Sequence, residues 1–322
     1  MTPDPRAPLF TEDATLHVVP VRALGQAAEA VVDRILDEAR PFTHLEICEV
    51  EPDGAALVRS LVERARGRRA EAGERLSIAV RATPDVVTPD LAAALAKGRV
   101  VLKCLFEGPL STGDAERLRE IHRLYSSFGV PPQLAFVNVG VPLDRASFEA
   151  GPRAIVDGLA AAGAIYVELL RTRERRLSDE EHADLHRACV SRILEVNRGG
   201  RVLVEMGLAL RLEAMSRGGR GPEPTVSIWA SPERASREDA GLFGEGCAGC
   251  PHEARCGLGV LRDPTVSLSE RRAGTPFCAA SKPLFDVATT LIAAQDRARL
   301  RTIFHVWHEA HLRVARHLGV SD

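Results

Sequence analysis

The sequence predicts an α/β protein whose core is a parallel β-sheet, and three observations support this prediction. Short apolar segments rich in Val, Ile and Leu alternate with longer segments in which apolar residues recur at helical spacing. Six such strand–helix units follow one another, which favours right-handed crossovers between parallel strands. The strands are apolar along most of their length, as is typical of strands buried on both faces. Two architectures fit this pattern: a doubly wound open sheet and a partial (β/α) barrel.

Each predicted strand precedes a predicted helix. The strands are expected at residues 16–22, 43–50, 75–83, 100–108, 133–140 and 164–171, and the helices at residues 25–39, 53–70, 89–98, 113–129, 151–163 and 177–200. Pro89 near the start of the third helix and Gly98 at its end are normal helix boundaries. Ser178, followed three residues later by Glu181, predicts a capping box at the start of the sixth helix.

The composition changes after about residue 215. The segment SRGGRGPEPT is a Gly/Pro/Arg linker, and the chain from there to about residue 280 shows little periodicity. That stretch is expected to form a loop-rich unit that a metal centre holds together. Residues 284–319 are again helical in pattern. We therefore expect one domain at residues 1–215 and a second at residues 216–322.

The overall composition excludes several classes of partner. The net charge is −2 and aromatic residues make up 4% of the chain, which argues against nucleic acid as a partner. No apolar run approaches the roughly 18–20 residues that span a bilayer, so no membrane contact is expected. The first residues also lack a charged-then-apolar signal pattern. A cytoplasmic location is the resulting prediction.

The cysteines carry the main chemical clue. There are seven, an odd number that argues against a disulfide framework in such a protein. Four of them are clustered near the C-terminus. Cys247, Cys250 and Cys256 form a C-x2-C-x5-C motif, and Cys278 follows twenty-two positions after Cys256. Thiolates are soft ligands suited to iron–sulfur clusters or zinc. A 4Fe-4S cluster is the leading interpretation; a structural zinc site and a set of unligated buried cysteines are the alternatives. The other three, Cys48, Cys104 and Cys189, lie in apolar segments and are predicted to be buried thiols.

With these residues in view, the sequence resembles the radical SAM enzymes that carry a C-terminal SPASM extension, over roughly residues 14–300. The segment LEICEVEPDGAALVRSLVERAR is similar to that family's second strand, Gly-Gly-Glu-Pro motif and following helix. Residues 81–118 resemble the third and fourth strands, with Glu-Gly-Pro where Asp-Gly-Pro is usual, and LAFVNVGVPLDR resembles the fifth strand with its Asn. The resemblance implies a partial (β/α)6 TIM-like barrel followed by a SPASM-like cluster-binding domain.

Two departures from the family bear on activity. The family places a C-x3-C-x2-C motif after the first strand, where it binds the cluster that reduces S-adenosylmethionine. Here that loop is PVRALGQAAEAV, and residues 1–47 contain no cysteine. The Gly-Gly-Glu-Pro motif is replaced by Glu49-Val50-Glu51-Pro52, and the lost glycines would have let the backbone approach the cofactor closely. We therefore expect that this chain does not cleave S-adenosylmethionine.

The C-terminal cysteines match the family more closely. SPASM domains usually hold two auxiliary clusters, and the four clustered cysteines of this chain match the ligand pattern of the second. The position of a further family cysteine is held by Val260, and no cysteine lies between Cys189 and Cys247 to serve the first cluster. The resemblance thus implies one retained 4Fe-4S cluster and the loss of the other as a complete set.

Other candidate residues have ordinary structural roles as alternatives. Glu51 and Asn138 lie at the ends of the second and fifth strands, where barrel ligands bind, and are candidate cofactor-binding residues. Glu51 is otherwise a vestigial polar residue, and Asn138 otherwise caps or turns the chain. The histidines in FHVWHEAH do not complete a His-Glu-x-x-His motif. The basic run at residues 171–176 is interpreted as a solvated loop.

The leading functional hypothesis is a catalytically inactive radical SAM-like protein that holds one auxiliary cluster. It would act as the partner or substrate-binding subunit of an active radical SAM paralogue, binding that enzyme, the precursor peptide or both, in the maturation of a ribosomally made peptide. The alternatives are a metalloenzyme of different chemistry and a structural zinc protein on the same fold.

Overall fold

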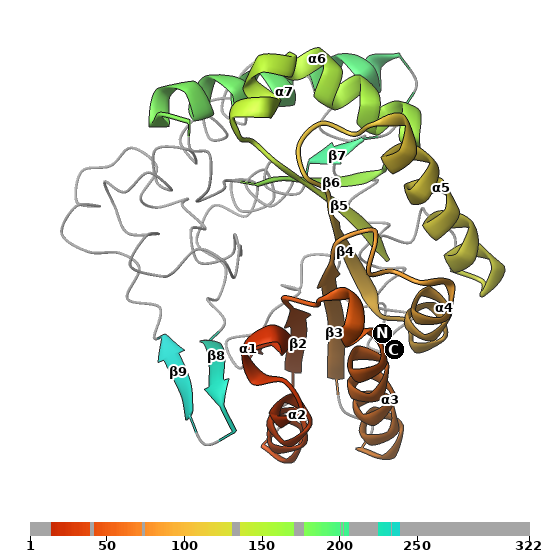
Figure 1. Ribbon diagram of the computed structural model, residues 1–322, viewed down its shortest axis with the longest axis vertical. Helices are drawn as coiled ribbons and strands as arrows, with labels where there is room; N and C mark the ends of the chain where they lie inside the picture. Colours follow the sequence, from red (N-terminus) through yellow and green to blue (C-terminus); the bar gives the residue numbers. More distant parts are fainter. Residues whose placement is uncertain are drawn as a thin grey trace, which may run out of the picture.

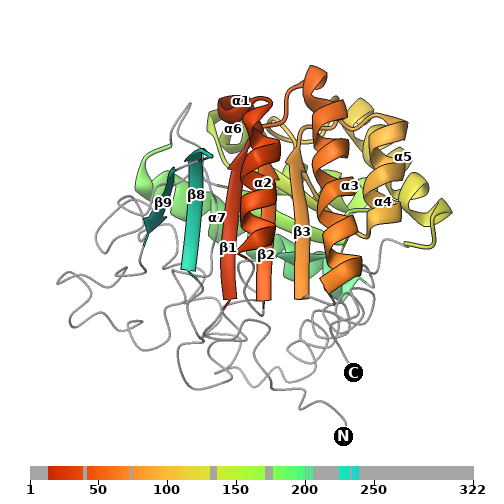
Figure 2. The same ribbon diagram turned by 90° about the horizontal axis from the view of Figure 1, so that it is seen from below.

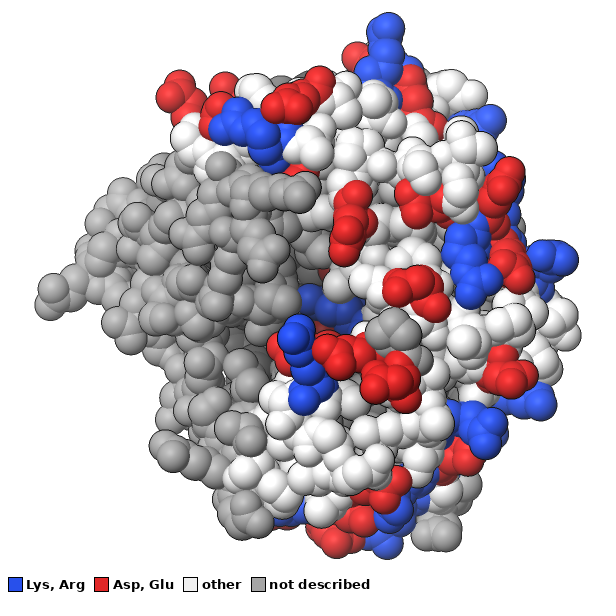
Figure 3. Space-filling view, in the orientation of Figure 1, with Lys and Arg blue, Asp and Glu red and all other residues white. Residues whose placement is uncertain are grey.

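The computed structural model describes residues 14–38, 42–72, 75–130, 136–170, 177–199, 201, 203–205, 225–232 and 234–238. The four clustered cysteines, the basic run at 171–176 and the predicted C-terminal helices lie outside these residues. No helix in the described ranges is long and apolar enough to cross a membrane. On the face shown in Figure 3, acidic and basic side chains are interspersed over the described surface.

The described strands form one sheet of nine strands (Figure 1). They are β1 (Ala14–Pro20), β2 (Phe42–Cys48), β3 (Arg75–Ala82), β4 (Val101–Leu105), β5 (Val137–Pro142), β6 (Tyr166–Leu170), β7 (Val204–Glu205), β8 (Thr225–Ser231) and β9 (Arg234–Glu238). Strands β1 to β7 are parallel and lie in chain order, while β8 pairs with the free side of β1 and β9 runs antiparallel to β8. Because β7 and β9 are its two ends, the sheet is not closed. The predicted α/β partial barrel is confirmed.

The helices follow the parallel strands one by one and cover the outer face of the sheet (Figures 1 and 2). They are α1 (Val21–Leu24), α2 (Ala27–Asp37), the 3₁₀ helix η1 (Pro52–Gly54), α3 (Ala55–Ala72), α4 (Pro89–Gly98), α5 (Thr112–Ser127), α6 (Arg145–Ala162) and α7 (Asp179–Arg198). Alternate strand residues point to opposite faces. Leu45 and Ile47 of β2 therefore join the core under the helices, whereas Glu46 and Cys48 face the inside of the curved sheet. The inner face is the one that positions the candidate site.

The capping box predicted at the start of α7 is present, and side chains also cap α5 and α4. The backbone N–H of Glu181 donates to Ser178 Oγ at 3.2 Å, and Ser178 N–H donates to Glu181 Oε2 at 2.8 Å, which completes the predicted capping box of α7. A second capping box, between Ser111 and Asp114, starts α5. At α4, Thr88 Oγ1 accepts from Leu91 N–H just before Pro89.

Helix α6 begins earlier than the sequence predicts. It starts at Arg145 rather than at residue 151. Asp144 is the N-cap residue, and its Oδ1 accepts a hydrogen bond from the backbone N–H of Ser147. Gly151 has non-helical torsion angles (φ 78°, ψ 164°) inside this span. The cause is Pro152, which disfavours the helical conformation of the residue before it and has no N–H to donate. The helix therefore consists of two segments joined at Gly151, and the sequence pattern identified only the second.

The β8–β9 hairpin lies in the stretch for which the sequence predicts little regular structure. It is held against β1 and α2 by Trp229, which is 3% exposed. Trp229 Nε1–H donates to His17 Nδ1 at 3.2 Å, and the Arg34 guanidinium lies 5.6 Å from the Trp229 ring centroid. These partners are about two hundred residues away from Trp229 in sequence, so no local sequence pattern predicts their contacts with it.

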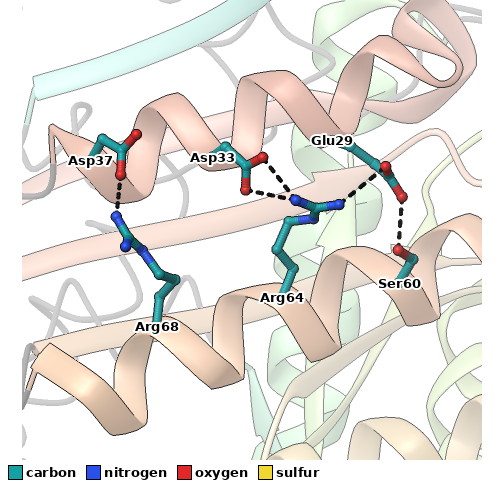
Figure 4. Close-up of polar contacts among 6 residues, drawn as sticks. All are labelled: Glu29, Asp33, Asp37, Ser60, Arg64 and Arg68. Atoms are coloured by element: carbon teal, nitrogen blue, oxygen red, sulfur yellow. Dashed lines mark hydrogen bonds and ion pairs between the residues drawn. The ribbon is translucent and has the colours of Figure 1, made fainter.

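A ladder of ion pairs joins α2 to α3 along their solvent side (Figure 4). Arg64 contacts Asp33 at 2.8 Å and Glu29 at 3.2 Å, Arg68 pairs with Asp37, and Ser60 Oγ donates to Glu29 at 2.7 Å. The contacts repeat about once per helical turn, so the two helices run alongside each other in register. Each exposed pair contributes at most about 1 kcal/mol.

Two helical glycines on neighbouring helices are expected to respond oppositely to alanine. A Cβ at Gly67 in α3 would meet no atom within 4 Å, so Gly67→Ala should raise the free energy of unfolding by about 1 kcal/mol. A Cβ at Gly98 in α4 would lie 2.9 Å from Arg66 Cδ and 3.1 Å from Val100 Cγ2. Gly98→Ala should therefore destabilise, by about 1–3 kcal/mol. Urea unfolding of both variants checks this, and an equal response at the two positions would contradict it.

This packing also corrects the role expected for Gly98. The sequence predicts Gly98 as the terminating residue of its helix, yet it is still helical, and the left-handed capping conformation is taken by Arg99 (φ 52°, ψ 47°). Gly98 is small because α3 passes close to it, and the requirement comes from tertiary packing rather than from helix termination.

Candidate functional site

The segment that follows β1 packs two of its side chains into the core of the protein. Helix α1 follows the strand directly, and Val21 and Leu24 are buried against the core. Between them Arg22 points outward, where its Nε lies 3.0 Å from Glu51 Oε1. Arg22 N–H also donates to the carbonyl oxygen of Glu49 at 3.2 Å. The segments after β1 and β2 are thus joined to each other by a backbone hydrogen bond and an ion pair.

One residue of the Glu49-Val50-Glu51-Pro52 segment has a backbone conformation that favours glycine. Glu49 has φ 54°, in the left-handed region that favours glycine. Val50 turns its side chain into the core, and Glu51 is extended just before η1. The residues present do not fit a cluster-bound sulfonium cofactor at this position, because the loop after β1 offers no thiolate and the motif carries side chains where glycines would leave the backbone bare.

Glu49→Gly is expected to stabilise the protein. A non-glycine residue in the left-handed region costs roughly 1–2 kcal/mol, and the exposed Glu49 side chain makes no hydrogen bond or ion pair with any described residue that would offset the gain. The free energy of unfolding should rise by about 1 kcal/mol. Glu63→Gly is the contrasting variant, because Glu63 lies inside α3 and glycine there should destabilise by about 1 kcal/mol. A Glu49→Gly protein less stable than the wild type would contradict the assignment of strain.

Three charged side chains meet on the inner face of the sheet. Glu46 of β2 is 1% exposed; its Oε2 accepts from Lys103 Nζ of β4 at 2.7 Å, and its Oε1 lies 3.3 Å from Arg81 Nε of β3. Lys103 crosses over β3 to reach Glu46, and the residue of β3 beside Glu46 is the small Ala79. The side chains of Arg81 and Lys103 are 3% and 16% exposed. We call these three residues the inner-face triad.

The electrostatics of the triad keep Glu46 ionised. Burial by itself raises the pKa of this carboxyl, but the nearby Lys103 and Arg81 charges and the Lys103 hydrogen bond outweigh burial and lower the pKa to about 2. His44 on the same strand lowers it further. At neutral pH the triad is one carboxylate between two cations, a fixed polar feature inside the sheet.

Asn138 lies next to the triad. It faces inward between Val137 and Val139, which belong to the outer core, and it pairs in register with Lys103 of β4 and Tyr166 of β6. It is 6% exposed, and no donor in the described ranges reaches its Oδ1. One pleat further along, a Cβ at Gly140 would lie 2.6 Å from Leu105 Cδ2 and 2.9 Å from Leu170 Cδ1, so leucine tips cover this strand at its carboxyl end.

The two predicted cofactor-binding residues therefore have different surroundings. Glu51 is at the surface in an ion pair with Arg22, whereas Asn138 is buried on the inner face. Sequence reasoning missed the triad. Its signal was present, because Glu46, Arg81 and Lys103 each interrupt an otherwise apolar strand.

The three isolated cysteines are buried free thiols, as predicted: Cys48 in β2, Cys104 in β4 and Cys189 in α7. Burial raises the pKa of Cys48 and of Cys189 to about 12 and raises that of Cys104 further, so all three are neutral. Within the described ranges, no group of three or more His, Cys, Asp or Glu side chains is arranged to hold a metal ion. The predicted ligands Cys247, Cys250, Cys256 and Cys278 lie outside those ranges, and their role stays a prediction.

Comparison with known proteins places the fold. The protein has a radical SAM-like fold, since it is similar to solved structures of anSMEcpe, a radical SAM/SPASM anaerobic sulfatase-maturating enzyme. Native anSMEcpe with bound AdoMet has a TM-score of 0.62 at 11% identity, and the match covers 88% of this chain and 100% of that one. Native anSMEcpe with bound AdoMet and Kp18Cys peptide has a TM-score of 0.64 at 11% identity, covering 88% and 98%. No family model matches the sequence. No curated protein matches it either.

Proposed function

We propose that this chain is a radical SAM-like protein without radical SAM chemistry of its own, which serves as the partner or substrate-binding subunit of an active radical SAM paralogue in the maturation of a ribosomally made peptide. The observation that carries the proposal is the segment after β1. Val21 and Leu24 are buried there, Arg22 is paired with Glu51, and no cysteine is present in residues 1–47.

The fold supports a binding role for the rest of the molecule. The open sheet, its strand order and its helix layer are retained, while the motif that would approach the sulfonium cofactor carries Val50 and a strained Glu49. A protein that keeps a large, ordered scaffold and lacks the ligands for its reaction is suited to hold another molecule. The choice of a peptide rests on the resemblance to SPASM peptide maturases and on the solved anSMEcpe complexes, in which that enzyme holds the Kp18Cys and Cp18Cys peptides.

The second part of the proposal concerns the C-terminal cysteines. Cys247, Cys250, Cys256 and Cys278 would hold one 4Fe-4S cluster, since four thiolates saturate such a cluster. When bound, the cluster would supply a structural crosslink or a one-electron relay. With all four positions taken by protein, the site has no open coordination position for a substrate, which argues against the alternative of a metalloenzyme with different chemistry.

Metal analysis tests the cluster. Protein purified without oxygen is expected to contain iron and acid-labile sulfide in equal amounts, with the brown absorption of a 4Fe-4S centre. Cys256→Ala should lose most of the iron, whereas Cys189→Ala, which removes a buried α7 thiol, should keep it. Zinc in place of iron would support the structural zinc alternative and contradict the cluster.

Co-purification tests the partner role. A tagged copy of this chain is expected to retain a cysteine-complete radical SAM paralogue from the same organism, a precursor peptide, or both. The isolated chain, supplied with reductant and S-adenosylmethionine, should form no 5′-deoxyadenosine. Retention of neither partner, or turnover of S-adenosylmethionine by the isolated chain, would overturn the proposal.

A further inference from the structure

A hydrogen bond between two ring nitrogens joins the β8–β9 hairpin to β1. Trp229 Nε1 lies 3.2 Å from His17 Nδ1, and Trp229 is 3% exposed. An indole N–H can only donate, so His17 Nδ1 is the acceptor. A ring nitrogen that accepts carries no proton. The bond therefore requires a neutral His17 imidazole whose proton is on Nε2.

This hydrogen bond is incompatible with protonation of His17. An imidazolium has an N–H on both ring nitrogens, so it cannot accept a hydrogen bond. Protonation would set two N–H groups against each other and would leave the buried indole N–H without this acceptor. Losing a partner of a buried donor should favour opening of the contact by about tenfold or more. Histidine is also the side chain whose charge changes between pH 5 and pH 8.

The charged neighbours act in the same direction. The Arg34 guanidinium of α2 lies 5.6 Å from the centroid of the indole ring, and the His17 ring lies 6.1 Å from that ring, between centroids. A protonated His17 would therefore add a second cation beside the same indole, and the two cations repel each other. Glu38, which pairs with Arg34 at 2.9 Å, lessens this repulsion. The register neighbours of His17 on β2 and β8 are the uncharged Leu45 and Ser227.

We propose that the contact between His17 and Trp229 is a pH-sensitive switch, which holds the β8–β9 hairpin on β1 at neutral pH and loosens it when His17 is protonated. The hairpin is the last described part of the chain before the clustered cysteines, and Cys247 follows nine positions after Glu238. Mild acid would therefore loosen the attachment of the segment that leads to these cysteines, while the parallel strands stay folded. The inference holds whether or not the cysteines bind a cluster.

The first test observes the hydrogen bond itself, by NMR of the indole N–H groups in the full chain. The chain has two tryptophans, Trp229 and Trp307, and Trp229→Phe assigns the Trp229 signal by its loss. Between pH 7.5 and pH 5.5 this signal should move upfield in the wild type, as a hydrogen bond is lost. In His17→Asn, which keeps an acceptor that does not titrate, it should stay in place. A wild-type signal that does not respond to pH, or an equal response in His17→Asn, would overturn the proposal.

The second test measures opening of the hairpin by amide hydrogen exchange, corrected for the intrinsic rate at each pH. The starting protein is His122→Leu, because burial lowers the pKa of His122 to about 4 and its proton uptake on unfolding would add a global effect. From pH 7.5 to pH 5.5, the protection of β8 should fall by about tenfold or more, whereas that of β3 should change by less than about threefold.

Two variants of this protein locate the cause. Adding His17→Asn should keep the protection of β8 at both pH values. Adding Trp229→Phe keeps an aromatic ring but removes the donor, so β8 should already be less protected at pH 7.5 and should respond less to acid. This second variant decides the matter if His17→Asn does not fold. Equal falls in β3 and β8, or a pH response that neither variant reduces, would overturn the proposal, whatever the iron analysis and the co-purification show.

Discussion

Replacing Glu46 with glutamine is expected to lower the free energy of unfolding by about 3–5 kcal/mol. The change keeps the shape of the side chain but leaves two buried cations, Lys103 and Arg81, facing a neutral amide. A buried charge that loses its partner keeps its desolvation cost and loses the attraction that offset it. Urea unfolding of the two proteins at pH 7 measures the difference.

Glu38→Gln is the control for this prediction. Glu38 also forms an ion pair with an arginine, Arg34 at 2.9 Å, but both side chains are about half exposed, so water replaces the lost interaction. We expect a change below about 0.5 kcal/mol. If Glu46→Gln were as mild as Glu38→Gln, the inner-face triad would not be the buried network described above.

The pH dependence of Glu46 has a definite sign. Its pKa is about 2 in the folded protein, below the ordinary value of 4.5, so the folded state favours the ionised form. The resulting stabilisation is complete above about pH 4.5 and is lost as the pH falls from 4.5 toward 2.

His122 produces the second large effect, at higher pH. Burial of this α5 side chain lowers its pKa from 6.5 to about 4, and its Nε2 has no hydrogen-bond partner within the described ranges. The folded protein therefore holds a neutral imidazole, whereas the unfolded chain takes up a proton below about pH 6.5. Stability should fall by about 3 kcal/mol in total as the pH drops from 6.5 to 4, on account of this group.

His122→Leu removes that proton uptake. Between pH 7.5 and pH 5, the wild type should lose about 2 kcal/mol more of its free energy of unfolding than the variant. Comparing each protein with itself at two pH values removes any constant effect of the substitution on packing. Parallel pH profiles for the two proteins would show that His122 is protonated as easily in the folded state as in the unfolded one.

The sequence determined the local architecture of this protein. Strand–helix alternation, the capping box of Ser178 and Glu181, and the burial of Cys48, Cys104 and Cys189 all depend on patterns within a few residues, and the structure confirms them. The absence of cysteine from residues 1–47 was also visible in sequence alone, because composition needs no geometry. The clustered cysteines near the C-terminus remain a prediction from spacing and resemblance.

The tertiary structure decided which polar residues meet. Lys103 and Glu46 are separated by fifty-seven residues and by the whole of β3, and only the sheet register brings them within 2.7 Å. Pairing of β8 with β1 likewise joins segments about two hundred residues apart. A strand pattern states which residues share a face, but not which strands are neighbours or how far a side chain reaches across them. For this reason the inner-face triad became apparent only in the folded chain.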